Sequence, residues 1–267
     1  MPEKKAQARN RYEVLIPTIF RNHYRRGLSD FEFDRSELET VAGQHGVKLP
    51  KNQGDLIYAF RYRIALPDEI VATGTGGRNW IIEPAGRARY RFRLATVSRI
   101  IPRDDLLATK IPDCTPEIIS AYALSDEQAL LARVRYNRLV DIFLGIAAYS
   151  LQNHMRTTVK GLGQIEIDEV YVGVNKNGQQ FVIPVQAKSG SDQLAATQTS
   201  QDVACGAEKY PGLSCRPVST QFMAGGVIAM FELTLQRGEV KVVEERHYRL
   251  VPSSEIGGED LRLYSSR

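Results

Sequence analysis

Four polar residues on two apolar segments have the types and spacing of a metal-dependent active site. Glu166 and Asp168 lie in the first segment, and Gln186 and Lys188 lie in the next. Charged residues inside apolar strands need a reason, because burying an unpaired charge is costly. Two carboxylates beside a lysine would suit Mg²⁺, which prefers hard oxygen ligands. The lysine would place or activate water, and the metal would stabilise the transition state of phosphodiester hydrolysis.

The two segments are predicted to be the strands of one hairpin. Asn177-Gly178 between them is typical of a two-residue turn. Such a turn would place Asp168 opposite Ala187, and a loop one residue longer or shorter would move its partner to either neighbour of Ala187. In each case Asp168 lies within one position of Gln186-Ala187-Lys188, on strands about 5 Å apart.

The elements around this hairpin indicate an α/β domain. One long helical stretch is expected from Ser125 to Thr158, with a break near Gly145, and a second helix is expected within residues 191–210. Three β-rich segments follow, at residues 218–222, 227–235 and 239–250.

These residues resemble a known family. Asp168, a hairpin and then Gln186-Ala187-Lys188 look like the Asp…(Asp/Glu)-x-Lys core of the PD-(D/E)xK nucleases. The strings YNRLVDIF, SLQNHMRTTVKG, GQIEIDEVYVGV and PVQAKSG are similar to segments of type II restriction endonucleases. The resemblance covers residues 130–195, and more weakly LPKNQGDLIYAFRYR. It implies a mixed sheet flanked by helices, with Asp168 as the metal aspartate and Lys188 as the catalytic lysine.

The sequence departs from the family pattern at three points. Gln186 stands where the family most often has Asp or Glu, and an amide can coordinate a cation through oxygen but adds no charge. Glu166 is then the candidate for a second carboxylate. In the preceding helix, where many relatives have Glu, the candidates are Asp141, Gln152 or no residue. Pro184 lies in the second strand, although proline is usually confined to edges or bulges.

The N-terminal part is predicted to be a winged-helix-like domain. A helix is expected within residues 11–30, and the segments 37–44 and 54–64 resemble a helix–turn–helix. A β-hairpin follows these helices, which is the order of elements in a winged helix. Lys51, Asn52 and Gln53 would begin a recognition helix, because Asn and Gln can read adenine edges. An ordinary polar turn is the alternative.

Alternation along the second strand of that hairpin places four arginines on one face: Arg87, Arg89, Arg91 and Arg93. Guanidinium groups bind phosphate oxygens bidentately, which favours DNA contact. A charged, solvated edge is the alternative. Arg156, in the segment 152–156 expected at the end of a helix, is a further candidate for phosphate contact, with helix C-terminal capping as the alternative.

Charge is divided unevenly along the 267 residues. The chain carries a net charge of +4, but residues 1–105 hold 19 basic and 13 acidic residues, whereas the remainder holds 16 and 18. A basic half is typical of a polyanion-binding domain. Three cysteines without CxxC spacing and no apolar run long enough for a membrane span indicate a reduced, cytoplasmic protein. The four histidines show no metal-ligand spacing.

Together these observations predict two domains, at residues 1–105 and 118–267, joined by a connector at 106–117. We expect a Mg²⁺-dependent endonuclease, with Mn²⁺ as a substitute, that cuts double-stranded DNA at a specific sequence as a homodimer. A DNA methyltransferase is the expected functional, not physical, partner. The alternatives are an inactive DNA-binding regulator and a repair or recombination nuclease that recognises DNA structure.

Overall fold

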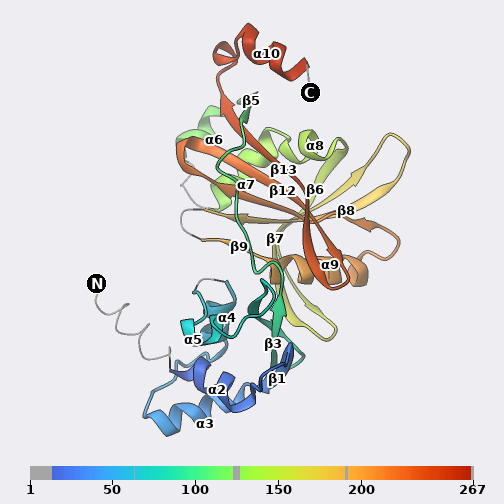
Figure 1. The fold of residues 1–267 in the computed structure, drawn as a ribbon. Helices are drawn as coiled ribbons and strands as arrows, with labels where there is room; N and C mark the ends of the chain where they lie inside the picture. The colour runs from blue at the N-terminus through green and yellow to red at the C-terminus, as the bar shows by residue number, and fades with distance from the viewer. Residues whose placement is uncertain (1–13, 63, 123–126, 190–191, 266–267) are drawn as a thin grey trace. The chain divides into compact units, whose positions relative to one another are not determined.

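The computed structural model describes residues 14–62, 64–122, 127–189 and 192–265 (Figure 1). The chain divides into two compact units. Among the described residues, the smaller unit contains those up to Ser98 together with Thr158–Ile165 and Ala195–Thr197, and the larger unit contains the others.

In its described part, the smaller unit combines four helices with a three-stranded antiparallel sheet of order β1-β3-β2. Its elements are α2 (Leu15–His23), β1 (Asp30–Asp34), α3 (Ser36–His45), α4 (Gly54–Tyr62), α5 (Asp68–Val71), β2 (Asn79–Pro84) and β3 (Arg89–Ala95). Buried aromatic rings hold the helices to the sheet: Phe20 on α2 makes edge contacts with Phe31, Trp80 and Phe92. Helix α2 is therefore anchored to all three strands.

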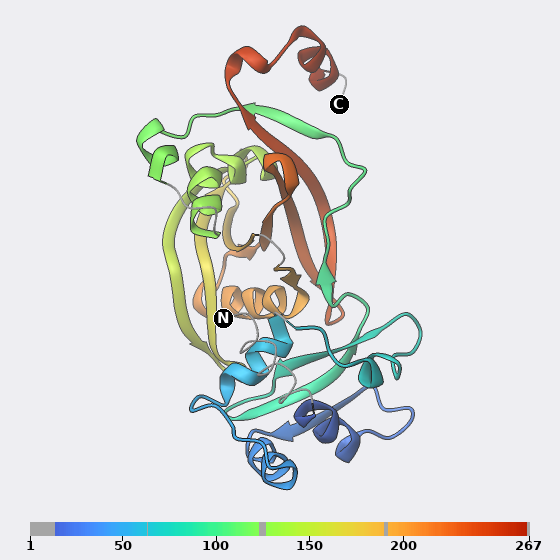
Figure 2. The same cartoon turned by 90° about the vertical axis from the view of Figure 1, so that its left-hand side faces the viewer.

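The larger unit contains a mixed eight-stranded sheet with flanking helices (Figure 2). Seven strands follow the order β5-β13-β12-β11-β8-β7-β6, and β10 pairs with β8. The strands are β5 (Ala108–Pro112), β6 (Ala147–Val159), β7 (Gly163–Val174), β8 (Gln180–Lys188), β10 (Ser214–Cys215), β11 (Val218–Phe222), β12 (Val227–Gln236) and β13 (Glu239–Val251). The helices are α6 (Glu117–Tyr122), α7 (Glu127–Tyr136), α8 (Leu139–Leu144), α9 (Ala196–Lys209) and α10 (Gly258–Ser265). Two further short strands are β4 (Arg99–Ile100) and β9 (Leu194–Ala195).

Connections between the strands follow from local chemistry. Arg237 and Gly238 join β12 to β13, and both have positive φ, 52° and 77°, as a two-residue turn of the I′ type requires. Strand β11 runs parallel to β8, so the chain must cross over between them, and α9 makes this crossover. The crossover places α9 directly against the strand that bears Gln186 and Lys188.

Alternation along β8 divides its side chains between two environments. Ile183, Val185 and Ala187 belong to the apolar core that also contains residues of α7 and α8. The intervening residues point to the other face of the sheet, toward α9. Gly206 on α9 permits a close approach there, because a Cβ at this position would lie 2.7 Å from the Cys215 sulfur and 3.3 Å from the Val182 side chain.

The mixed sheet with flanking helices agrees with the predicted α/β class, but the single helical stretch from Ser125 to Thr158 is wrong. Two helices, α7 and α8, occupy its first part, and Gly145, with φ of 64°, ends α8. Residues 147–159 form strand β6, so the segment 152–156 is not the end of a helix. Leu, Gln and Met in this segment favour helix, but pairing with β7 overrides that local preference.

Smaller differences between the predicted and the observed elements arise from strand pairing, which local sequence patterns do not reveal. The connector at 106–117 includes strand β5, which pairs with β13 at the edge of the sheet. Strand β1 was not expected, although helix α2 before it lies within the predicted range of residues 11–30. Of the four aligned arginines, Arg87 precedes β3 and lies in the turn, whereas Arg89, Arg91 and Arg93 do share one face. No helix in the described part of the chain is long and apolar enough to cross a membrane.

Candidate functional site

The β7–β8 hairpin brings Asp168 against the Gln186-Ala187-Lys188 segment. The loop is one residue longer than the predicted two-residue turn, because Asn175 pairs with Gln179. The antiparallel pairing sets Glu169 opposite Val185, so the next position along β7 sets Asp168 opposite Gln186. This is one of the three predicted registers. A direct contact fixes it: the backbone N–H of Ala187 donates to Oδ2 of Asp168 over 2.8 Å.

The surroundings of Asp168 disfavour the charged form of its carboxyl group. Burial raises the pKa of Asp168 above its ordinary value, while the Ala187 N–H and the Lys188 ammonium oppose this rise. Glu166 and Glu127 add repulsion that raises it further. Lys188 is half-buried and close enough to act on Asp168 electrostatically. A bound cation would relieve the repulsion that these carboxylates impose on Asp168.

Gln186 is buried in a hydrogen-bond network rather than open to solvent. Its exposed fraction is 1%, and its amide nitrogen donates to the backbone oxygen of Glu166 over 3.2 Å and to Oδ1 of Asp202 over 2.9 Å. Its amide oxygen accepts from Nε2 of Gln198 over 3.1 Å. Helix α9 supplies both side-chain partners. We call Asp168, Gln186, Lys188, Gln198 and Asp202 the hairpin site.

Asp202 is the most deeply buried acid of the hairpin site. Burial raises its pKa well above the usual carboxyl value, the Gln186 hydrogen bond opposes the rise, and repulsion from Asp168 adds to it. Sequence reasoning missed Gln198 and Asp202. Their spacing of four residues on an expected helix was the available signal, because it places both on one helix face. Glu127, the first residue of α7, was missed as well.

Glu166 was predicted as a second metal carboxylate, and in the structure its side chain has other partners. One carboxylate oxygen lies 3.0 Å from Nε2 of His154, and the other accepts from Arg156 over 3.3 Å. Both partners come from the neighbouring strand β6. Arg156, a predicted phosphate contact, is therefore paired with a carboxylate. Asp168 lies beside Ala187, whereas Glu166 is held toward β6.

The other helix and strand candidates also have structural partners. Asp141 on α8 pairs with Arg138 and accepts the backbone N–H of Ala148. Gln152 lies on β6, not on a helix. Glu169 on β7 is fully buried against Arg135, whose Nε donates to it over 2.8 Å. None of these contacts places a helix carboxylate of α8 at the hairpin site.

The oxygen atoms of the hairpin site fit Mg²⁺ in type. In residues 14–62, 64–122, 127–189 and 192–265, no three His, Cys, Asp or Glu side chains form a ready metal cluster. Mg²⁺ nevertheless often uses one or two carboxylates and fills its remaining positions with water and substrate phosphate. Asp168 offers a carboxylate, and Gln186 offers an amide oxygen. Oε1 of Gln198 is buried without a partner in the described part of the chain, so a further oxygen there lacks a donor or a cation.

The predicted DNA-contacting residues other than Arg156 lie in the smaller unit, and several already have partners. Arg89 and Arg91 pair with Glu32, and Arg93 pairs with Glu83 over 3.3 Å. We call Arg89, Arg91 and Arg93 the arginine face. Their alternation is as predicted, but the neighbouring strands supply carboxylates that neutralise much of their charge.

The residues before α4 are similarly tied to the fold. The side-chain oxygen of Asn52 accepts the backbone N–H of Gly54, and its amide nitrogen donates to Asp55 over 2.7 Å. Gln53 donates to Glu39 over 2.6 Å. Lys51 is exposed. Asn52 therefore stabilises the start of α4, as Asn commonly does at a helix N-terminus.

No family model matches the chain, and comparisons with curated proteins and with solved structures give no match.

Proposed function

We propose that this protein is a Mg²⁺-dependent endonuclease of the PD-(D/E)xK type that hydrolyses double-stranded DNA. The observation that supports it most strongly is the contact between Asp168 and Ala187, which sets the carboxylate beside Gln186 and Lys188. The order of elements around this contact also supports the proposal. The resemblance implies a mixed sheet flanked by helices, and the hairpin lies in a sheet of this kind: β7 and β8 are antiparallel, and β11 lies parallel to β8.

In this proposal each residue of the hairpin site has a separate task. Asp168 and the Gln186 amide oxygen would hold the metal, and the Ala187 N–H fixes the orientation of the Asp168 carboxylate. Lys188 would orient or deprotonate the attacking water and offset charge on the reacting phosphate. When bound, Mg²⁺ supplies Lewis-acid stabilisation of the phosphate and lowers the pKa of water.

The smaller unit would bind the DNA. Its order of helices and strands, with the sheet order β1-β3-β2, is compatible with a winged-helix-like domain in which α4 would lie in the major groove. Lys51 is the best placed of the three candidates at its start, because Asn52 and Gln53 have partners within the unit. The arginine face is the weaker candidate because it is paired with Glu32 and Glu83.

A DNA-binding regulator without nuclease activity is a second candidate, favoured by the bonds of Gln186. Its amide oxygen accepts from Gln198, and Glu166 pairs with His154 and Arg156. Asp168 then remains as the main carboxylate of the hairpin site. One carboxylate and an occupied amide would bind a cation weakly in the absence of DNA.

A cleavage assay separates the two functions. Purified full-length protein is incubated with long DNA of many sequence contexts in Mg²⁺, in Mn²⁺ or in EDTA. The nuclease proposal expects cutting that requires the metal, and Lys188→Ala lowers the rate by at least about 100-fold. Lys176→Ala is the matched control, because this exposed lysine lies in the hairpin loop. Binding to DNA without cutting under any metal would favour the regulator.

A further inference from the structure

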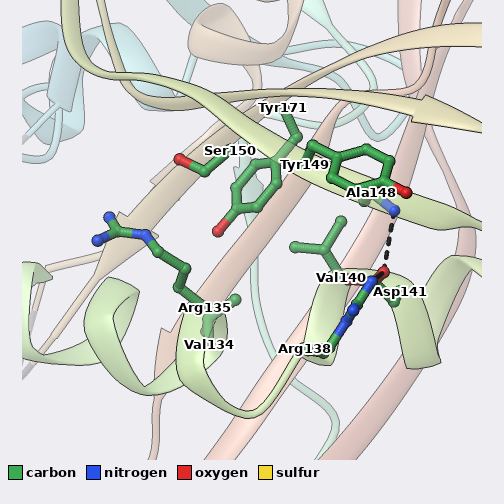
Figure 3. A pocket seen from close by; sticks show the side chains of 9 residues that line it. All are labelled: Val134, Arg135, Arg138, Val140, Asp141, Ala148, Tyr149, Ser150 and Tyr171. Carbon is green, nitrogen blue, oxygen red and sulfur yellow. Dashed lines mark hydrogen bonds and ion pairs between the residues drawn. The ribbon is translucent and has the colours of Figure 1, made fainter.

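A pocket lies in the larger unit, and the residues that line it are outside the hairpin site. It has a volume of about 300 Å³ and is bordered by α7, α8, β6 and β7 (Figure 3). Val134, Val140 and Ala148 give it an apolar wall. This volume is at the lower end of the roughly 300–1,000 Å³ of small-molecule sites. The pocket would therefore hold a compact ligand.

A buried hydroxyl group points into this space. Tyr171 is 3% exposed, and its hydroxyl interacts electrostatically with Glu169 and Arg135 without a hydrogen bond of good geometry to any described residue. Burial and the nearby Glu169 carboxylate raise the pKa of Tyr171 well above its usual range, so the group stays protonated and can donate. Figure 3 shows the hydroxyl on the side of the pocket where Arg135 lies. Buried donors without a partner are rare in folded proteins, and a ligand would satisfy this one.

Two guanidinium groups border the same space. Arg135 donates from Nε to Glu169 over 2.8 Å and from Nη2 to Asn153 over 3.2 Å. A guanidinium carries five N–H donors, so these two bonds use a part of its capacity. The fixed position of Arg135 above a buried carboxylate makes it a preorganised donor.

Arg138 is placed by an unusual backbone conformation. It lies between α7 and α8 with a φ of 50°, which is uncommon for a residue other than glycine, asparagine or aspartate. Such residues cluster at binding sites, where the surrounding structure maintains the strain. Its side chain pairs with Asp141, which also accepts the Ala148 N–H. The side chain of Arg138 is 62% exposed and so remains accessible to a ligand.

We propose that this pocket binds a small organic anion, with a carboxylate or phosphate group on a compact apolar body. The anionic group would accept hydrogen bonds from Arg135, Arg138 and the Tyr171 hydroxyl, because guanidinium groups match the geometry of both anions. The apolar body would lie against Val134, Val140 and Ala148. This site is independent of the proposed nuclease activity.

Calorimetric titration of the full chain tests the proposal with benzoate, phenyl phosphate, inorganic phosphate and neutral benzyl alcohol as probes. We expect at least one of the two aromatic anions to bind more tightly than both inorganic phosphate and benzyl alcohol. Comparing benzoate with phenyl phosphate identifies the preferred anionic group. Tyr171→Phe and Arg138→Gln should each weaken binding by roughly ten-fold, since each removes one donor to a charged group. Tyr210→Phe, outside the pocket, should bind like the wild type.

Thermal unfolding distinguishes a ligand-binding hydroxyl from a structural one. Tyr171→Phe should unfold at an unchanged or higher temperature, because it removes a buried polar group without breaking a hydrogen bond. The proposal is overturned if neither aromatic anion binds at millimolar concentration. It is also overturned if Tyr171→Phe and Arg138→Gln both bind as tightly as the wild type, or if Tyr171→Phe unfolds at a clearly lower temperature.

Discussion

The hairpin site and the arginine face both place polar residues along a β-strand, but their surroundings differ. At the hairpin site, α9 covers the strand, so Gln186 and Asp202 are buried and bond to each other. On the arginine face the side chains stay at the surface of a three-stranded sheet and pair with Glu32 and Glu83. Alternation predicts which face a side chain occupies, but the element packed against that face decides its chemistry.

The largest effect on stability should come from the hairpin site, which is the more buried of the two regions. Gln186→Ala leaves the buried carboxyl group of Asp202 and the half-buried amide of Gln198 without their partner. Each unsatisfied buried group costs about 1–3 kcal/mol, so the free energy of unfolding should fall by about 3 kcal/mol. Urea denaturation measures this change. Gln164→Ala, at an exposed position of β7, should change it by less than about 0.5 kcal/mol. Equal effects of the two variants would mean that the network contributes nothing to stability.

A second prediction concerns pH and again applies to the buried site. Asp202 keeps its proton to higher pH in the folded protein than in the unfolded chain. Above the ordinary carboxyl pKa, the unfolded state therefore binds fewer protons, and the free energy of unfolding falls as pH rises, by up to about 1.4 kcal/mol per pH unit. The fall ends once the pH exceeds the folded-state value.

Asp202→Asn should flatten this dependence, since an amide oxygen can still accept from Gln186 but does not ionise. Denaturation curves at a series of pH values test it, with Asp104→Asn at an exposed position as the control. A pH dependence that is identical in the wild type and Asp202→Asn would show that Asp202 is not the group responsible.

The smallest effect is expected on the arginine face. Arg91→Ala removes exposed ion pairs with Glu32 and Glu83, and such pairs contribute about 1 kcal/mol or less. The loss should shrink further in high salt, because exposed charges are screened. Denaturation at low and high salt measures both, with Arg26→Ala, also exposed, as the control. A loss above about 2 kcal/mol would mean that these ion pairs contribute as much to stability as the buried hydrogen bonds of the hairpin site.

Local features of the sequence predicted the hairpin well. Asn177-Gly178 and the two β-rich segments identified β7 and β8, and Gly178 does adopt a positive φ of 79°. Strands β11, β12 and β13 were also predicted close to their observed bounds, whereas the short strand β10 was not predicted. The predicted loop was one residue too short. The side-chain oxygen of Asn175 accepts the backbone N–H groups of Asn177 and Gln179 and so closes a longer turn.

Features that depend on distant packing were not predicted. Strand β6 contains helix-favouring residues and becomes a strand through its pairing with β7. Asp202 lies 16 residues beyond Gln186 in the sequence, and α9 must dock on the sheet before the two side chains meet. The partners of the arginine face come from β1, a strand that was not expected, and from β2. In each case the pattern within one segment does not reveal which element covers it.

We propose that Asp168 holds a metal for DNA cleavage, and a comparison of cleavage rates tests this assignment. Cleavage of DNA in Mg²⁺ is measured for the wild type, for Asp168→Asn and for Asp104→Asn. We expect Asp168→Asn to fold but to cut at least about 1,000-fold more slowly, because the amide loses the charge that attracts the cation. Asp104→Asn should cut at the wild-type rate. Cleavage by Asp168→Asn at the wild-type rate would contradict the assignment of the active site.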